Sequence, residues 1–102
     1  MKIKSVWNNV GTKQLSTVLS KITKEKTMQN FLRDVMTEKE IIEIASRLQA
    51  AKMLNEKINY EKVISDTKLS SRTIARISNW LKNGCKGYIE AIKIINSHRY
   101  TS

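Results

Sequence analysis

Apolar residues recur three and four positions apart along most of this chain, and this spacing limits its possible folds more than any other feature. In an α-helix such positions share one face, which packs against neighbouring helices. The chain contains no proline, the residue that most strongly breaks a helix interior. It also lacks a convincing segment with the two-residue alternation of a half-buried strand. The pattern therefore predicts an all-α fold.

Capping signals divide this periodic sequence into about six predicted helices. Thr37 and Glu40 form a capping box, in which two side chains satisfy free backbone N–H groups at a helix start. Asn59 and Ser70 are suited to the N-cap position, and Gly84 to a left-handed C-cap. The predicted helices cover residues 12–21, 24–35 (capped by Thr23), 38–56, 60–66, 71–83 and 88–97.

Chain length favours a single domain over residues 1–102. A chain of this size buries only about two-thirds of the surface that its unfolded form exposes. A lone monomer would therefore be marginally stable, and a partner subunit is one common remedy.

A net charge of +10 and a pI near 10.0 make the expected partner a polyanion. Nucleic acid is the first candidate and an anionic membrane surface the second. The alternative is a basic surface with no dedicated partner. No run of about 18 apolar residues is present, so we expect no membrane span.

The residues needed for metal or covalent chemistry are scarce. Cys85 is the only cysteine and His98 the only histidine, so neither a disulfide framework nor a Cys/His metal site is expected. No nucleophile constellation accompanies His98, and no glycine-rich phosphate loop occurs. We expect neither an enzyme nor a cofactor. With no apolar N-terminal signal segment, the predicted location is the cytoplasm.

The predicted helix at residues 71–83 combines an apolar back with a basic front. At 100° per residue, Ile74, Ile77 and Leu81 fall within about 60° of one another. Arg72, Arg76 and Asn79 point the opposite way. Residues 67–89 contain no Asp or Glu, which would repel phosphates. The predicted helices at 60–66 and 71–83, with three residues at 68–70 between them, have helix-turn-helix spacing.

This arrangement suits the major groove of DNA, which admits such a helix with its first turns against the bases. Arginine can donate two parallel hydrogen bonds to guanine, and asparagine can match adenine. The residues predicted to face the groove are Ser71, Arg72, Thr73, Arg76 and Asn79, and those predicted to contact phosphates are Lys68, Ser70 and Lys82. The alternative is an ordinary solvated helix.

Three blocks resemble the Trp-repressor superfamily, and within it the YerC/YecD type of TrpR-related proteins. They are "FLRDVMTEKEI" (31–41), "RLQAAKML" (47–54) and "SSRTIARISNWLKNGCKGY" (70–88), in the order and spacing of that family. The resemblance implies an intertwined homodimer whose N-terminal helices, within about residues 12–56, build a shared core. Each subunit would then present one recognition helix to half-sites about one DNA turn apart.

The sequence departs from the tryptophan pocket of the Trp repressor. Arg76 matches one pocket arginine, but Ser46 stands where the second is expected. Bulky Ile77 and Trp80 replace small residues and would fill the cavity. We therefore expect no response to tryptophan and no other small-molecule ligand.

A further departure is Lys68, which stands where helix-turn-helix turns usually carry glycine with φ > 0. A lysine in that conformation costs on the order of 1 kcal/mol.

The sequence as a whole predicts a dimeric bacterial transcriptional regulator that binds specific double-stranded DNA. One alternative is a sequence-tolerant architectural nucleic-acid-binding protein, for which the overall charge would matter more than Arg72 or Asn79. Another is a helical protein-interaction module that uses the apolar last helix.

Overall fold

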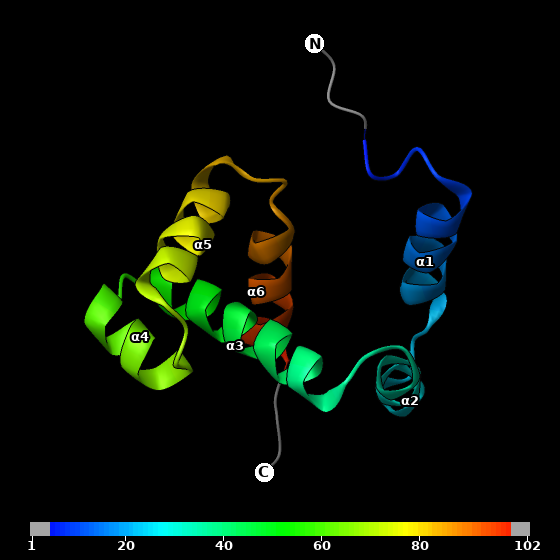
Figure 1. Cartoon of the computed structure of the whole chain (residues 1–102), viewed down its shortest axis with the longest axis horizontal. Helices are drawn as coiled ribbons and strands as arrows, with labels where there is room; N and C mark the ends of the chain where they lie inside the picture. Colours follow the sequence, from blue (N-terminus) through cyan, green and yellow to red (C-terminus); the bar gives the residue numbers. More distant parts are fainter. Residues whose placement is uncertain (1–4, 99–102) are drawn as a thin grey trace. The chain divides into compact units, whose positions relative to one another are not determined.

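The computed structural model describes residues 5–98, which form six α-helices and no strand (Figure 1). The all-α prediction is confirmed, and each predicted helix end lies within two residues of the observed one. The helices are α1 (Val10–Lys21), α2 (Glu25–Val35), α3 (Glu38–Asn55), α4 (Tyr60–Thr67), α5 (Ser71–Asn83) and α6 (Gly87–Ser97).

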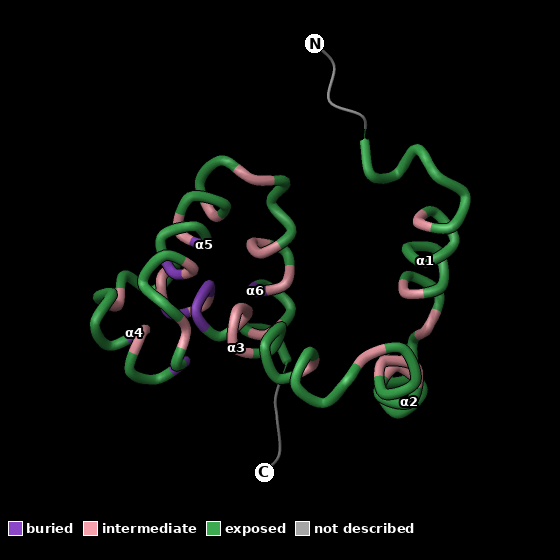
Figure 2. Tube along the Cα trace, in the orientation of Figure 1, coloured by how far each residue is buried: buried purple, intermediate pink, exposed green. Residues whose placement is uncertain are grey.

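The chain divides into two compact units, one holding α1 and α2 (residues 1–38) and one holding α3 to α6 (residues 39–102). No residue between 5 and 38 is buried, although α1 and α2 carry apolar stripes (Figure 2). The single domain predicted for residues 1–102 stays a prediction.

The second unit has a small hydrophobic core to which all four of its helices contribute (Figure 2). α4 packs against α5, and α5 packs against α6. The buried apolar residues are Ala50, Ala51 and Met53 of α3, Val63 of α4, Ile74 and Ile77 of α5, and Ile92 of α6.

Two of the predicted N-caps are confirmed by hydrogen bonds. Oδ1 of Asn59 accepts from the backbone N–H of Lys62 at 2.9 Å, and Oγ of Ser70 accepts from that of Thr73 at 3.1 Å. The prediction that Thr23 caps α2 was wrong, because Lys24 holds the N-cap position, without a side-chain hydrogen bond. With the helix starting at Glu25, Thr23 lies one residue too early to cap it.

The predicted left-handed cap at Gly84 was also wrong. Gly84 has φ −88° and ψ −158°, which is extended backbone that any residue adopts. Glycine is required there for space, since a Cβ atom would lie 2.5 Å from the carbonyl oxygen of Trp80. The left-handed residues in the described part of the chain are instead three lysines, Lys57, Lys68 and Lys86, with φ of 66°, 62° and 69°.

Replacing Lys68 by glycine is expected to raise the free energy of unfolding by about 0.5–1 kcal/mol. Glycine removes the steric cost of φ 62° but gives the unfolded chain more freedom, so the gain is only partial. Urea denaturation measures the change. The control is Lys62→Gly inside α4, which should instead destabilise the fold by about 1 kcal/mol. A loss of stability in Lys68→Gly would contradict the strain at this position.

Candidate nucleic-acid interface

The connection between α4 and α5 is held by backbone geometry and by one buried side chain. Lys68 ends α4 in the left-handed conformation, and its N–H donates to the carbonyl oxygen of Ile64 at 2.8 Å. Thr67 is buried, and its Oγ1 donates to the carbonyl oxygen of Val63 at 2.7 Å while accepting from the N–H of Leu69 at 3.3 Å. The first two residues of the turn are therefore tied to α4.

The apolar back of α5 packs as its spacing predicts. Ile74 and Ile77 have no exposed surface, and both belong to the core cluster with Val63. Leu69 and Leu81 pack against this cluster and are half-buried. The rotation of α5 about its axis is thereby fixed.

The opposite face of α5 is open to solvent. Arg72, Arg76 and Asn79 are all exposed in the single chain. Within residues 5–98, neither arginine forms an ion pair, and the pairs that do form involve other basic residues. The guanidinium groups are therefore available to an external acceptor.

Hydrogen bonds at the start of α5 leave Thr73, but not Ser70, with a hydroxyl proton to donate to a ligand. Oγ of Ser70 donates to Oγ1 of Thr73 at 3.0 Å and accepts from the N–H of Thr73. The single hydroxyl proton of Ser70 is thus used within the helix cap. Thr73 keeps its own hydroxyl proton, so it can donate to a phosphate oxygen or a base in this conformation.

Asn79 is engaged by a residue that the sequence reasoning did not single out. Nδ2 of Asn83, one turn further along α5, donates to Oδ1 of Asn79 at 2.9 Å. The NH₂ group of Asn79 is left to donate outward, and its oxygen retains a second lone pair. The i, i+4 spacing of two asparagines is the sequence signal that could have found this pair.

The structure places all eight predicted site residues on α5 or in the turn before it. Lys68, Ser70 and Ser71 lie at its N-terminal end, and Lys82 lies in its last turn, about 18 Å further along the axis. Seven of the eight are exposed, and Thr73 is half-buried. Arg72, Arg76 and Asn79 form one strip along the helix, whereas Ser71, Thr73 and Lys82 lie about 80–100° to either side of Arg72.

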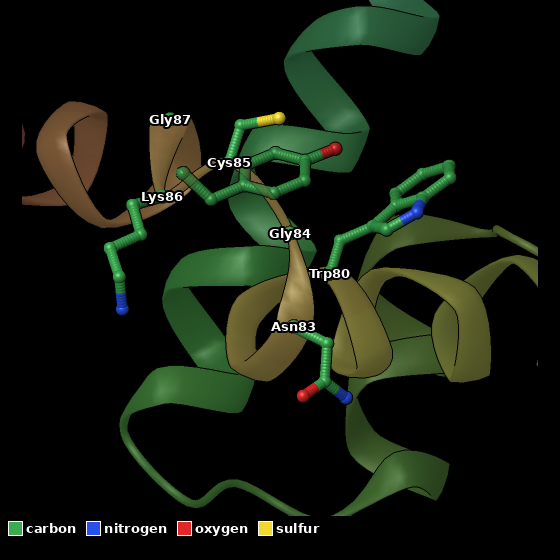
Figure 3. A pocket seen from close by; sticks show the side chains of 7 residues that line it. Trp80, Asn83, Gly84, Cys85, Lys86 and Gly87 are labelled. Carbon is green, nitrogen blue, oxygen red and sulfur yellow. The ribbon is translucent and has the colours of Figure 1, made fainter. Parts of the chain in front are cut away.

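An open hollow of about 640 Å³ adjoins the end of α5 (Figure 3). It is lined by Trp80, by Tyr88 and by the connection to α6, with the side chains of Trp80 and Cys85 on one side and that of Asn83 on the other. Trp80 is 40 % exposed and lies outside the core, whereas Ile77 is fully buried. Of the two bulky residues expected to fill a tryptophan cavity, only Ile77 is packed inside the chain.

None of the arginines among residues 5–98 lines this hollow, although the charge of Arg47 on α3 acts on Tyr88. Burial raises the pKa of the Tyr88 hydroxyl, and the charge of Arg47 partly offsets that rise. Tyr88 therefore stays protonated at neutral pH. Arg47 also lies 3.8 Å from a carboxylate oxygen of Glu43, and its buried Nε has no hydrogen-bond partner among the described residues.

Between residues 5 and 98, no three His, Cys, Asp or Glu side chains are grouped so that they could hold a metal ion. No helix in that range is both long and apolar enough to cross a bilayer.

Comparison with known proteins shows the family to which this helical chain belongs. The family model for the Trp repressor protein matches residues 11–96. The chain belongs to the Trp repressor family. It is 32 % identical over 83 residues to the uncharacterized protein YerC of Bacillus subtilis, a match that covers 78 % of this chain and 80 % of YerC. Within the family it is thus a YerC-type protein.

Solved structures support the same family. The structure of a TrpR-like protein from Eubacterium eligens matches with a TM-score of 0.82 at 26 % identity, covering 92 % of this chain and 97 % of that one. A structure from Staphylococcus aureus matches with a TM-score of 0.80 at 22 % identity, covering 91 % and 93 %, and supports the fold alone.

Proposed function

We propose that this protein is a sequence-specific double-stranded DNA-binding transcriptional regulator that acts as a homodimer. The observation that carries the proposal is the two-sided character of α5. Its back, with Ile74 and Ile77, is locked into the core, and its front, with Arg72, Arg76 and Asn79, is open and free of acids. Family membership favours DNA as the partner.

In this proposal α4, the turn and α5 act as a helix-turn-helix. The first turns of α5 enter the major groove, where Arg72 and Arg76 donate to base edges. Thr73 and the free N–H groups at the start of α5 bind phosphate. Lys68 and Lys82 add phosphate contacts at the two ends of the strip.

The homodimer is supported by apolar surface that the single chain leaves uncovered. No described residue of the first unit is buried. Large apolar side chains are more than 40 % exposed on both units, among them Leu15, Val18, Ile42 and Ile44. A second copy that packs on these faces would supply the core that so small a chain lacks.

Sedimentation velocity tests the dimer directly. We expect a species of twice the 11.8 kDa chain mass at micromolar concentration. A folded species that sediments at the single-chain mass throughout that range would contradict the dimer.

We also propose that tryptophan is not a corepressor here. Neither Arg76 nor Arg47 lines the hollow beside Trp80, where the basic lining residue is Lys86, so neither arginine is placed there to form a bidentate pair with the carboxylate of an amino acid. The affinity for DNA is expected to be unchanged by tryptophan, and a tenfold rise would overturn this part of the proposal.

Selection of bound duplexes from a random pool tests the specific function. We expect a recurring sequence, with binding that a large excess of random duplex displaces poorly. The second candidate, a sequence-tolerant architectural protein, is favoured by the net charge of +10. It predicts that random duplex competes as well as any selected one, and that outcome would overturn specific regulation.

A further inference from the structure

A second groove, of about 350 Å³, lies beside α5 on the side of α4. Its polar rim combines residues from three parts of the chain. Lys57 comes from the connection between α3 and α4, Tyr60 from the first turn of α4, and Ser78 and Lys82 from α5. The groove therefore exists only because α4 and α5 are folded against the end of α3.

The charge of this groove is uncompensated. Neither Lys57 nor Lys82 forms an ion pair within the described range of 5–98, and no Asp or Glu lines the groove. The acids next to lining residues in the sequence are Glu56, which is bound to Lys52 at 2.8 Å, and Glu61, which is exposed and does not line the groove. The two free ammonium groups, with the hydroxyls of Tyr60 and Ser78, offer hydrogen-bond donors to one anion.

The position of the groove around α5 relates it to the strip that faces the bases. At 100° per residue, Ser78 and Lys82 lie about 120° and 80° from Arg72, both in the same rotational direction. Trp80 lies about 80° from Arg72 in the other direction. The charged groove thus flanks one side of the strip, and the apolar hollow of Trp80 flanks the other. With a helix in the major groove, the sugar–phosphate backbones run along its flanks.

We propose that this groove binds a phosphate of the DNA backbone, held between Lys57 and Lys82. The assignment rests on the proposed DNA-binding function and extends it beyond α5 and its turn to Lys57. The contact carries no sequence information, but it fixes how deeply and at what angle α5 enters the groove. It would also make the footprint asymmetric, with the tighter backbone contact on the side of α4.

The chain offers a closely matched pair of variants for the test. Lys57 and Lys86 are both exposed lysines with left-handed backbone, at φ 66° and 69°, and both follow a helix end closely. Asparagine tolerates that conformation and removes the charge. Lys86 lines the apolar hollow on the other flank, so Lys86→Asn is the control for Lys57→Asn.

We expect Lys57→Asn to weaken binding about three- to tenfold, equally on a selected and on a random duplex. The slope of log affinity against log salt should fall by about one. Lys86→Asn should stay within twofold of the wild-type affinity on both duplexes. Equal behaviour of the two variants, or a loss confined to the selected sequence, would overturn the assignment.

A scan of the selected duplex with single neutral methylphosphonate linkages locates the contact independently of variant stability. At one flanking position the methylphosphonate should lower the affinity of the wild-type protein. The affinity of Lys57→Asn should be the same for that duplex as for the unmodified one. Full additivity at every position would overturn the assignment and leave the proposed function intact. A wild-type protein that binds no duplex at all would overturn both.

Discussion

Replacing Ile74 by alanine is expected to lower the free energy of unfolding by about 2–5 kcal/mol. The Ile74 side chain has no exposed surface, and it packs where α4, α5 and the end of α3 meet. Truncation removes buried methyl groups and leaves a cavity that the surrounding helices cannot fully close. Urea denaturation at a fixed protein concentration measures the change, because dimerisation would make stability depend on concentration.

Arg76→Ala, two residues further along the same helix, serves as the matched control for Ile74→Ala. Arg76 is exposed and unpaired among the described residues, so its removal should change stability by less than about 0.5 kcal/mol. Similar losses in both variants would mean that the front of α5 is also packed, and the orientation of the helix would then be wrong.

Arg72→Ala is expected to cost about 1–3 kcal/mol of binding free energy on the selected duplex and much less on random duplex. Arg72 lies in the first turn of α5, where a recognition helix comes nearest to the base edges, and its guanidinium has no internal partner in the described part of the chain. Arg72 can form a bidentate pair only where the duplex presents guanine. Removing the arginine therefore lowers affinity for a duplex that has guanine at this position more than for random duplex. Dissociation constants for both duplexes must be measured at one salt concentration.

Lys93→Ala provides the charge-matched control for Arg72→Ala. Lys93 lies on α6, and its ammonium already pairs with Glu90 at 3.2 Å. Its removal should leave the preference for the selected duplex unchanged. If Arg72→Ala weakens both duplexes equally, Arg72 contacts only the backbone, and the reading of bases must be assigned to other residues.

The helices and the two faces of α5 could be predicted from the sequence because both depend on local periodicity. A stripe such as Ile74, Ile77 and Leu81 sets which side of a helix turns inward, whatever its neighbours are. Asn59 and Ser70 predict helix starts for an equally local reason, since the side-chain oxygen of each accepts a hydrogen bond from an N–H group three residues later.

Features that depend on close contacts in the folded chain could not be predicted from local periodicity. The need for glycine at Gly84 comes from the carbonyl oxygen of Trp80, not from a left-handed turn. The groove at Lys57 forms only when the end of α3 meets α4 and α5. The bond from the N–H of Leu69 to Oγ1 of Thr67 requires the final geometry of the turn.

Periodicity also does not tell which partner covers an apolar stripe. The spacing in α1 and α2 correctly marks amphipathic helices, yet neither contains a buried residue. Ile42 and Ile44 in the first half of α3 are likewise more than half exposed. The same pattern thus serves both a core within the chain and, as we propose, a core shared with a second copy.

The most direct test of the proposed DNA-reading face is an NMR titration of the ¹⁵N-labelled protein with the selected duplex. The largest shifts are expected in the backbone amides of residues 68–79, where the turn and the exposed face of α5 meet the groove. Amides of the exposed end of α6, around Ile94, should move little. Shifts confined to α1, α2 or α6, with residues 68–79 unchanged, would contradict binding through this face.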